Sequence, residues 1–186
     1  MKLVIINGTT STGKTTLARK LSKDLNIPAF IRDDYKEKEF DLLGKSPSFK
    51  QLAAIHIKSD KHLYKVIEDA VKRDESLIVE SNFTHAQGSK IKNLIKPNTV
   101  VVEIFCFANG FRVFKRYASR YKSGKRHRGH RDYLWYPIVA VEAFGLSKLR
   151  YRPLKFSSNV LMVDTNDFAA IDYNAIRKFV AEAKNA

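Results

Sequence analysis

The feature that most constrains this chain is a glycine-bracketed segment that directly follows an apolar run near the N-terminus. Residues 3–16 read LVIINGTTSTGKTT, and Gly8, Gly13, Lys14 and Thr15 fit the spacing Gly-x4-Gly-Lys-Thr. The apolar run predicts a strand and the following residues predict a helix, the context in which this pattern forms a phosphate-binding loop, or P-loop. Glycines let backbone N–H groups approach a phosphate closely, and the helix N-terminus adds its positive dipole end.

This P-loop predicts that the chain binds a nucleoside triphosphate. We expect the Lys14 ammonium to reach the β- and γ-phosphates and the Thr15 hydroxyl to bind Mg²⁺. A glycine turn that only links a strand to a helix is the alternative, and the presence of all four motif residues argues against it. The residues expected to bind the nucleotide are those of the whole loop: Gly8, Thr9, Thr10, Ser11, Thr12, Gly13, Lys14, Thr15 and Thr16.

The rest of the chain alternates between strand-like and helical patterns. Short apolar runs predict five strands, at 2–6, 28–31, 76–80, 99–107 and 160–164. One helix is predicted over 14–25, and a second helical region opens at Ser46 and Pro47, read as the N-cap and the first helical residue. This alternation predicts an α/β fold with a parallel sheet. Because no repeat or linker interrupts it, we expect a single domain over 1–186.

The charge balance favours anionic partners. The net charge is +15, from 34 Lys and Arg against 19 Asp and Glu, which suits nucleotides, nucleic acid or an acidic surface. Nine of these cations and no acid lie in 112–131, beside Gly124 and Gly129, so we expect a mobile basic segment there. The lone Cys106 lies in an apolar run and is expected in the core. No stretch suits a signal peptide or a membrane span, so we expect a cytoplasmic protein without a membrane partner. The sequence does not predict the oligomeric state.

Acidic residues follow two of the predicted strands, where parallel sheets bind their ligands. Arg32-Asp33-Asp34-Tyr35 follows the second strand, and a carboxylate there could accept the proton of a hydroxyl that receives a phosphoryl group. A surface turn capped by an aspartate is an equal alternative. The third strand ends in Glu80, a candidate for holding Mg²⁺ or a substrate group, and the alternative is a buried glutamate paired with a lysine.

The P-loop followed by Arg-Asp-Asp-Tyr resembles the kinase part of phage polynucleotide kinases. It is also similar to the wider group of small P-loop kinases that includes gluconate, shikimate and chloramphenicol kinases and zeta-type toxins. The resemblance implies a three-layer α/β/α P-loop NTPase fold with five parallel strands in the order 2-3-1-4-5, as in nucleoside monophosphate kinases. It implies transfer of the γ-phosphate of ATP to an acceptor hydroxyl, with Mg²⁺, Asp33 as the general base, and Asp34 orienting Arg32 or the next segment.

The basic segment resembles the lid of these kinases. Arg112, Arg116 and Arg120 are four residues apart and would share one helical face, where a polyanion would relieve their mutual repulsion. The resemblance implies a lid over about 110–135, with Arg116 and Arg120 acting in catalysis.

The lid sequence continues as Arg126-His127-Arg128-Gly129-His130, which is similar to predicted kinases of the same superfamily. The resemblance implies that Arg126 and Arg128 contact the nucleotide phosphates. We expect His127 and His130 to pack in the lid or to contact phosphate, because no cysteine or carboxylate cluster accompanies them to complete a metal site.

The acceptor stays open at this point: a small metabolite, a nucleoside or nucleotide, or a nucleic-acid 5′-hydroxyl. A P-loop ATPase or a nucleic-acid-binding ATPase without an acceptor is the competing interpretation, and Tyr133, Trp135 and Tyr136 would either stack bases or pack a helix. The guanine-binding pattern of GTPase switches is absent from the sequence. The segment 164–166, after the fifth strand, is equally suited to loop capping and to contact with adenine.

Overall fold

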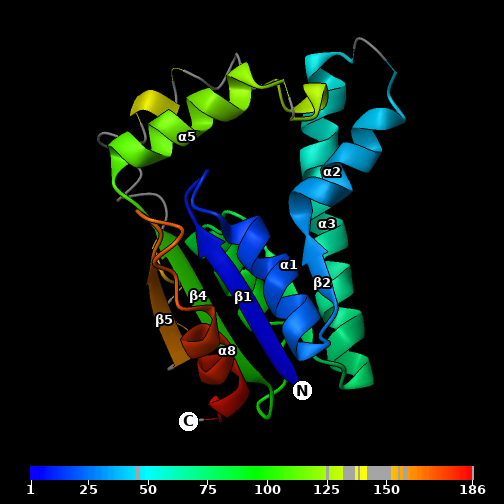
Figure 1. The fold of residues 1–186 in the computed structure, drawn as a ribbon. Helices are drawn as coiled ribbons and strands as arrows, with labels where there is room; N and C mark the ends of the chain where they lie inside the picture. The colour runs from blue at the N-terminus through cyan, green and yellow to red at the C-terminus, as the bar shows by residue number, and fades with distance from the viewer. Residues whose placement is uncertain are drawn as a thin grey trace.

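Five parallel strands form one sheet at the centre of the molecule (Figure 1). The computed structural model describes residues 1–44, 47–124, 126–131, 137, 139–141, 152–154, 156 and 159–185. The strands are β1 (Lys2–Gly8), β2 (Ala29–Ile31), β3 (Leu77–Glu80), β4 (Val100–Phe107) and β5 (Asn159–Asp164). Their order is β2-β3-β1-β4-β5, which confirms the expected fold class and strand order.

The register of the sheet brings the ends of its central strands together. Ile6 of β1 lies opposite Glu80 of β3, and Gly8 lies opposite Cys106 of β4. On the other side of β3, Ile31 also lies opposite Glu80, directly before the Arg32–Asp41 segment. The P-loop, the third-strand acid and the start of that segment therefore lie at one carboxyl edge of the sheet.

Helices cover both faces of the sheet. Helices α1 (Lys14–Leu25) and α8 (Tyr173–Glu182) pack on one face. Helices α3 (Phe49–Arg73) and α4 (His85–Lys92) pack on the other. The alternation of β1 side chains divides the two cores: Val4 and Ile6 with Leu17, Leu21 and Val180 on the first face, and Leu3 and Ile5 with Leu63, Ile67 and Ile91 on the second.

Two local predictions met different outcomes. Helix α1 spans the predicted residues, and it ends because Asn26 adopts the left-handed conformation that closes a helix. The predicted start of the second helical region was wrong. Helix α3 begins at Phe49, because Ser48 and Gln51 form a capping box that satisfies two backbone N–H groups. The expected cap Ser46 lies outside the described residues.

Helix α2 (Arg32–Asp41) follows β2 directly and was not predicted as a helix. Only Lys36 and Phe40 of this helix are buried, so its sequence lacks the apolar stripe that marks an amphipathic helix. The turn alternative for the Arg-Asp-Asp-Tyr segment is therefore wrong. The consequence is that Asp33 lies in the first turn of a helix whose direction β2 sets.

The basic segment forms helix α5 (Gly110–Lys122) and a short 3₁₀ helix, η1 (Arg128–His130). Asn109 caps α5 by accepting a hydrogen bond from the Arg112 amide at 2.8 Å. Figure 1 shows α5 above the carboxyl ends of β1 and β4, with η1 near the outer part of α2. Cys106 is buried as expected, and none of the described helices is both long and apolar enough to cross a membrane.

Candidate functional site

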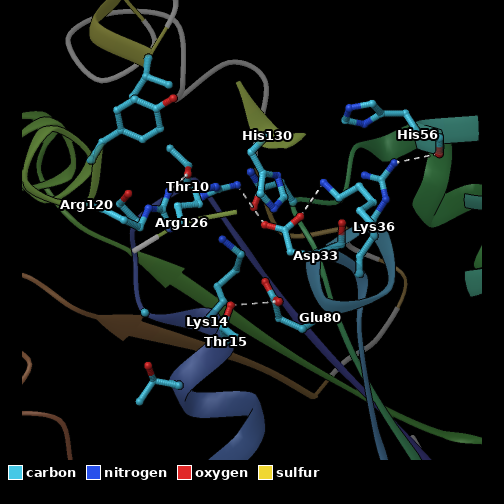
Figure 2. A pocket seen from close by; sticks show the side chains of 18 of the residues that line it. Thr10, Lys14, Thr15, Asp33, Lys36, His56, Glu80, Arg120, Arg126 and His130 are labelled. Carbon is cyan, nitrogen blue, oxygen red and sulfur yellow. Dashed lines mark hydrogen bonds and ion pairs between the residues drawn. The ribbon is translucent and has the colours of Figure 1, made fainter. Parts of the chain in front are cut away.

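A cavity of about 670 Å³ opens at the carboxyl edge of the sheet (Figure 2). Its lining comes from the P-loop, the end of β3, helices α2, α3 and α4, and the lid. The residues of the predicted loop that line it are Thr10, Ser11, Gly13, Lys14, Thr15 and Thr16. Gly8, Thr9 and Thr12 belong to the same loop but do not line the cavity.

Both motif glycines have a backbone that other residues rarely adopt. Gly8 has φ +136°, and a Cβ there would lie 2.1 Å from the carbonyl oxygen of Cys106. Gly13, the N-cap of α1, has φ +80°. These positions require glycine, because the loop must turn tightly while β1 lies against β4.

The interior of the loop is arranged around one carbonyl group. The Thr9 oxygen accepts hydrogen bonds from Lys14 Nζ at 2.6 Å and from Thr12 Oγ1 at 2.8 Å. Burial lowers the pKa of Lys14, and the Glu80 carboxylate opposes this effect. Within the described residues, the buried Ser11 Oγ has no hydrogen-bond partner. An ammonium and a hydroxyl are thus placed beside backbone amides, which suits a bound phosphate.

Thr15 and Glu80 form the floor of the cavity. Thr15 Oγ1 donates a hydrogen bond to Glu80 Oε2 at 3.2 Å, and only 5% of Glu80 is exposed. Burial raises the pKa of Glu80, and the nearby Lys14 opposes this shift. A hydroxyl and a carboxylate are oxygen ligands that fit Mg²⁺. Among the described residues no group of three His, Cys, Asp or Glu could hold a metal.

Asp33 projects into the cavity from the first turn of α2 (Figure 2). One carboxylate oxygen lies 2.5 Å from Lys36 Nζ, and the other lies 3.2 Å from the Arg126 guanidinium. Burial alone would raise the pKa of Asp33, but the cations of Lys36 and Arg126 outweigh it and lower this pKa well below its usual range. Asp33 is therefore ionised at neutral pH and can accept a proton or a hydrogen bond.

Asp34, the acid next to Asp33, has different contacts from the expected ones. Of the two roles expected for Asp34, orienting Arg32 is wrong, because residues two positions apart on a helix point about 200° apart. That Asp34 orients the next segment stays a prediction. Asp34 contacts Arg19 at 2.8 Å on the exposed surface. Arg32 instead pairs with Asp60 of α3 at 2.6 Å and donates from Nε to Ser59 Oγ at 3.1 Å.

The four lid arginines separate into two pairs. Arg120 and Arg126 line the cavity, and Arg120 donates to Thr10 Oγ1 at 3.4 Å. Arg116 lies outside it, where its guanidinium is 3.6 Å from the centre of the Phe168 ring and donates to the Asn166 carbonyl group. Arg128 is exposed on η1 and does not line the cavity.

A set of contacts between residues 127–130 and α2, the lid–α2 contact, joins the lid to α2 beside the cavity, which His130 lines. His130 Nε2 lies 2.9 Å from Glu37, and His127 Nε2 lies 3.0 Å from Asp41. Gly129 packs so closely that a Cβ there would lie 2.3 Å from the Phe40 ring. Burial and the nearby Arg126 lower the pKa of His130 to about 3, so its imidazole is neutral at neutral pH. Of the two expected roles, the histidines show lid packing.

One buried amide joins the two sides of the cavity. The Asn7 side-chain oxygen accepts hydrogen bonds from the Gly8 amide at 2.7 Å and the Phe83 amide at 2.9 Å. Its nitrogen donates to Glu103, a buried carboxylate of β4, at 3.2 Å. The first residue of the P-loop and the segment after β3 are therefore held by the same side chain.

Two further expectations concern the lid edge and the last strand. Thr165 donates through its amide and its hydroxyl to the Phe107 carbonyl group, at 2.8 and 2.9 Å. The Asn166 amide donates to Asp164, so these contacts are those of a capped loop. The aromatic residues Tyr133, Trp135 and Tyr136 lie outside the described residues.

Sequence reasoning missed the residues that α2, α3 and α4 contribute to the cavity, among them Lys36, His56, Asp60 and Gln87. Lys36 lies in the stretch Lys-Glu-Lys-Glu, which is typical of a solvated helix surface. Asp60 and Gln87 are far from the P-loop in sequence, and only the packing of their helices brings them to the cavity. The spacing of Asp60 four residues after His56 was the only available signal, and it is common on helices.

Comparison with solved structures finds kinases that are similar to this chain. A structure described as a "putative kinase", from Chloroflexus aurantiacus J-10-fl, is 31% identical, with a TM-score of 0.84 over 98% of this chain and 97% of that one. The chain belongs to the family of this protein. Neither a family model nor a curated protein matches the sequence.

More distant structures share the fold alone. A sugar kinase from Janibacter sp. HTCC2649 is 12% identical, with a TM-score of 0.59 over 96% of this chain and 91% of that one. A shikimate kinase from Bacteroides thetaiotaomicron is 17% identical, with a TM-score of 0.54 over 96% of this chain and 94% of that one. These two kinases therefore share the α/β fold of this chain.

Proposed function

We propose that the protein is an ATP-dependent phosphotransferase that moves the γ-phosphate of ATP to an acceptor hydroxyl. One observation carries this proposal: the Asp33 carboxylate and the P-loop Lys14 line the same cavity, with Thr15 and Glu80 on the floor between them. A nucleotide site alone needs no ionised carboxylate on the opposite wall. The family membership supports the same reaction class.

On the nucleotide side, the triphosphate would lie along the backbone amides of the P-loop. It would also contact the Ser11 hydroxyl, which has no hydrogen-bond partner among the described residues. Lys14 would exchange its contact with the Thr9 carbonyl group for the β- and γ-phosphates. Thr15 and Glu80 would hold Mg²⁺, which when bound neutralises charge on the phosphate oxygens. Arg120 and Arg126 lie over this end of the cavity, where they would stabilise charge that develops during transfer.

On the acceptor side, Asp33 would accept the proton of the hydroxyl group. The bond from the acceptor oxygen to the γ-phosphorus forms as the bond from that phosphorus to the β–γ bridging oxygen breaks, and ADP leaves. The cations of Lys36 and Arg126 keep the carboxylate ionised until the proton transfers. The lid–α2 contact would exclude water, so that transfer is favoured over hydrolysis.

The variant Asp33→Asn tests the base, with Asp34→Asn as the matched control, because Asp34 faces Arg19 on the exposed surface. Transfer of labelled phosphate from ATP would be followed across a panel of hydroxyl acceptors, and ATP binding by calorimetry. We expect Asp33→Asn to bind ATP normally while transfer falls by about 10² to 10⁴-fold. Asp34→Asn should behave as the wild type.

Wild-type transfer by Asp33→Asn would overturn the assignment of the base. Rapid ATP hydrolysis by the wild type that no acceptor alters would favour the ATPase interpretation over the phosphotransferase. The two outcomes are separated by measuring phosphate release and phosphorylated acceptor in the same reaction.

A further inference from the structure

The wall of the cavity opposite the P-loop shows which kind of acceptor it fits. We call it the acceptor wall and define it by five residues that line the cavity: His56 and Asp60 from α3, Ser81 and Asn82 after β3, and Gln87 from α4. None of them belongs to the P-loop or the lid. An acceptor with its hydroxyl near Asp33 would lie against this wall.

The cations beside the acceptor wall are already neutralised by acids. Arg32 pairs with Asp60 at 2.6 Å, and its Nε is further held by Ser59. Lys36 pairs with Asp33 at 2.5 Å. An anionic group on the acceptor would therefore have to break an existing ion pair to gain a cation, while Asp33, Asp60 and Glu80 repel it.

The neutral groups of the acceptor wall, unlike these paired cations, have donors and acceptors that are available to a ligand. In the part of the chain that the structure describes, the His56 imidazole, the Ser81 hydroxyl and the Asn82 amide make no side-chain hydrogen bond. Partial burial, with the cations of Lys36 and Arg32, lowers the pKa of His56 to about 4, so its ring offers one donor and one acceptor at neutral pH.

Asp60 adds an acceptor atom to this set. Arg32 and Gln87 both contact its Oδ1, at 2.6 and 3.2 Å. Among the described residues no donor contacts Oδ2. A carboxylate oxygen with this freedom accepts hydrogen bonds from hydroxyl groups, and its charge is already balanced by Arg32.

We propose that the acceptor is an uncharged polyhydroxylated small molecule, of the sugar or sugar-alcohol class, recognised by hydrogen bonds to Asp60 Oδ2, His56, Ser81 and Asn82. This inference rests on the proposed phosphotransferase function and adds the chemistry of its substrate. A polynucleotide is a poorer fit, because among the described residues the cations beside this wall, Arg32 and Lys36, are already paired with acids and would not be free to meet its phosphates.

Matched pairs of acceptors test the charge of the substrate. D-glucose and D-glucitol would be compared with D-gluconate and D-glucuronate, and with an oligonucleotide that carries a 5′-hydroxyl. Binding would be followed by saturation-transfer NMR with a non-hydrolysable ATP analogue present, and transfer with labelled ATP. We expect a neutral compound to bind and accept phosphate, and its acid to have a kcat/KM at least about tenfold lower.

Two variants locate the effect on the acceptor wall. Asn82→Ala removes an amide that makes no side-chain hydrogen bond among the described residues, and should raise the KM of the neutral acceptor about tenfold while leaving the KM of ATP unchanged. Asp60→Asn removes the charge that balances Arg32, and should shift the preference about tenfold toward the acid. Asp69→Asn, on the same helix but away from the cavity and paired with Lys65, is the control and should change neither ratio.

The outcomes separate this inference from the proposed function. Preference for an acid or for the oligonucleotide, in a reaction that Asp33→Asn abolishes, would overturn the neutral acceptor and keep the phosphotransferase. Absence of binding by every neutral compound, in protein that binds ATP, would also overturn it. If Asn82→Ala left the acceptor KM unchanged and Asp60→Asn left the preference unchanged, the residues of the acceptor wall would not be those that bind the acceptor.

Discussion

The two sides of the cavity are built in different ways. The nucleotide side consists of consecutive residues of one loop, and its geometry is set by the backbone of Gly8 and Gly13. The acceptor side is assembled from several separate elements, α2, α3, α4 and the lid, which are held by side-chain pairs such as Arg32–Asp60 and by the lid–α2 contact. A change on the first side should therefore damage folding and nucleotide binding together, whereas a change on the second should alter chemistry or selectivity in a stable protein.

Gly8→Ala should have the largest effect on the nucleotide side. The new Cβ would meet the Cys106 carbonyl group at 2.1 Å in a backbone region that L-residues rarely adopt. We expect the free energy of unfolding to fall by about 3 kcal/mol or more. Gly124→Ala is the control, since it has φ +64° in open space and should cost only about 1 kcal/mol. Equal denaturation midpoints for the two variants would contradict this account.

Lys36→Met tests the acceptor side, because it should change the protonation of Asp33 while the protein stays folded. Removing the ammonium that lies 2.5 Å from the carboxylate raises the pKa of Asp33 toward its usual range. The acid limb of the pH–rate profile should then move to higher pH. Lys38→Met, on the exposed face of α2, should leave the profile in place, and an unmoved limb in Lys36→Met would show that Asp33 is not the titrating base.

Arg126→Ala and Arg128→Ala form a pair that tests which lid residues act in the cavity. The sequence predicts phosphate contacts for both, but only Arg126 lines the cavity and contacts Asp33. We expect transfer to fall about tenfold in Arg126→Ala. Arg128→Ala should change it by less than about twofold, as a surface substitution does. Equal losses in steady-state kcat would indicate that both arginines act on the nucleotide.

Gly129→Ala should have a smaller effect, on the partition between transfer and hydrolysis. A Cβ at this position would lie 2.3 Å from the Phe40 ring and push the lid away from α2. We expect phosphate release to rise about threefold relative to acceptor phosphorylation, because water enters an incompletely closed site. An unchanged ratio in a double-label assay would show that the lid–α2 contact does not control water access.

The difference between the two sides also explains what the sequence could predict. The strands, helix α1 and the P-loop follow from patterns within a few residues, and the strand order followed from a family resemblance. Helix α2 was missed because Lys36 and Phe40 are its only buried residues. The pairing of Arg32 with Asp60 depends on how α3 lies beside α2, which no local pattern encodes. Arg116 and Arg120 share a spacing, yet the ring of Phe168 holds the first outside the cavity.

The side chain of Asn7 gives the site a fixed span. Since the same oxygen accepts hydrogen bonds from the Gly8 and Phe83 amides, the start of the loop and the segment after β3 are held at a fixed separation. In the proposed reaction this would fix the distance between the γ-phosphate and the acceptor. Substitutions on α3 and α4 could then change the selectivity for the acceptor without moving the groups that react. A scaffold of this kind can change its substrates while the distance that the transferred group must travel stays the same.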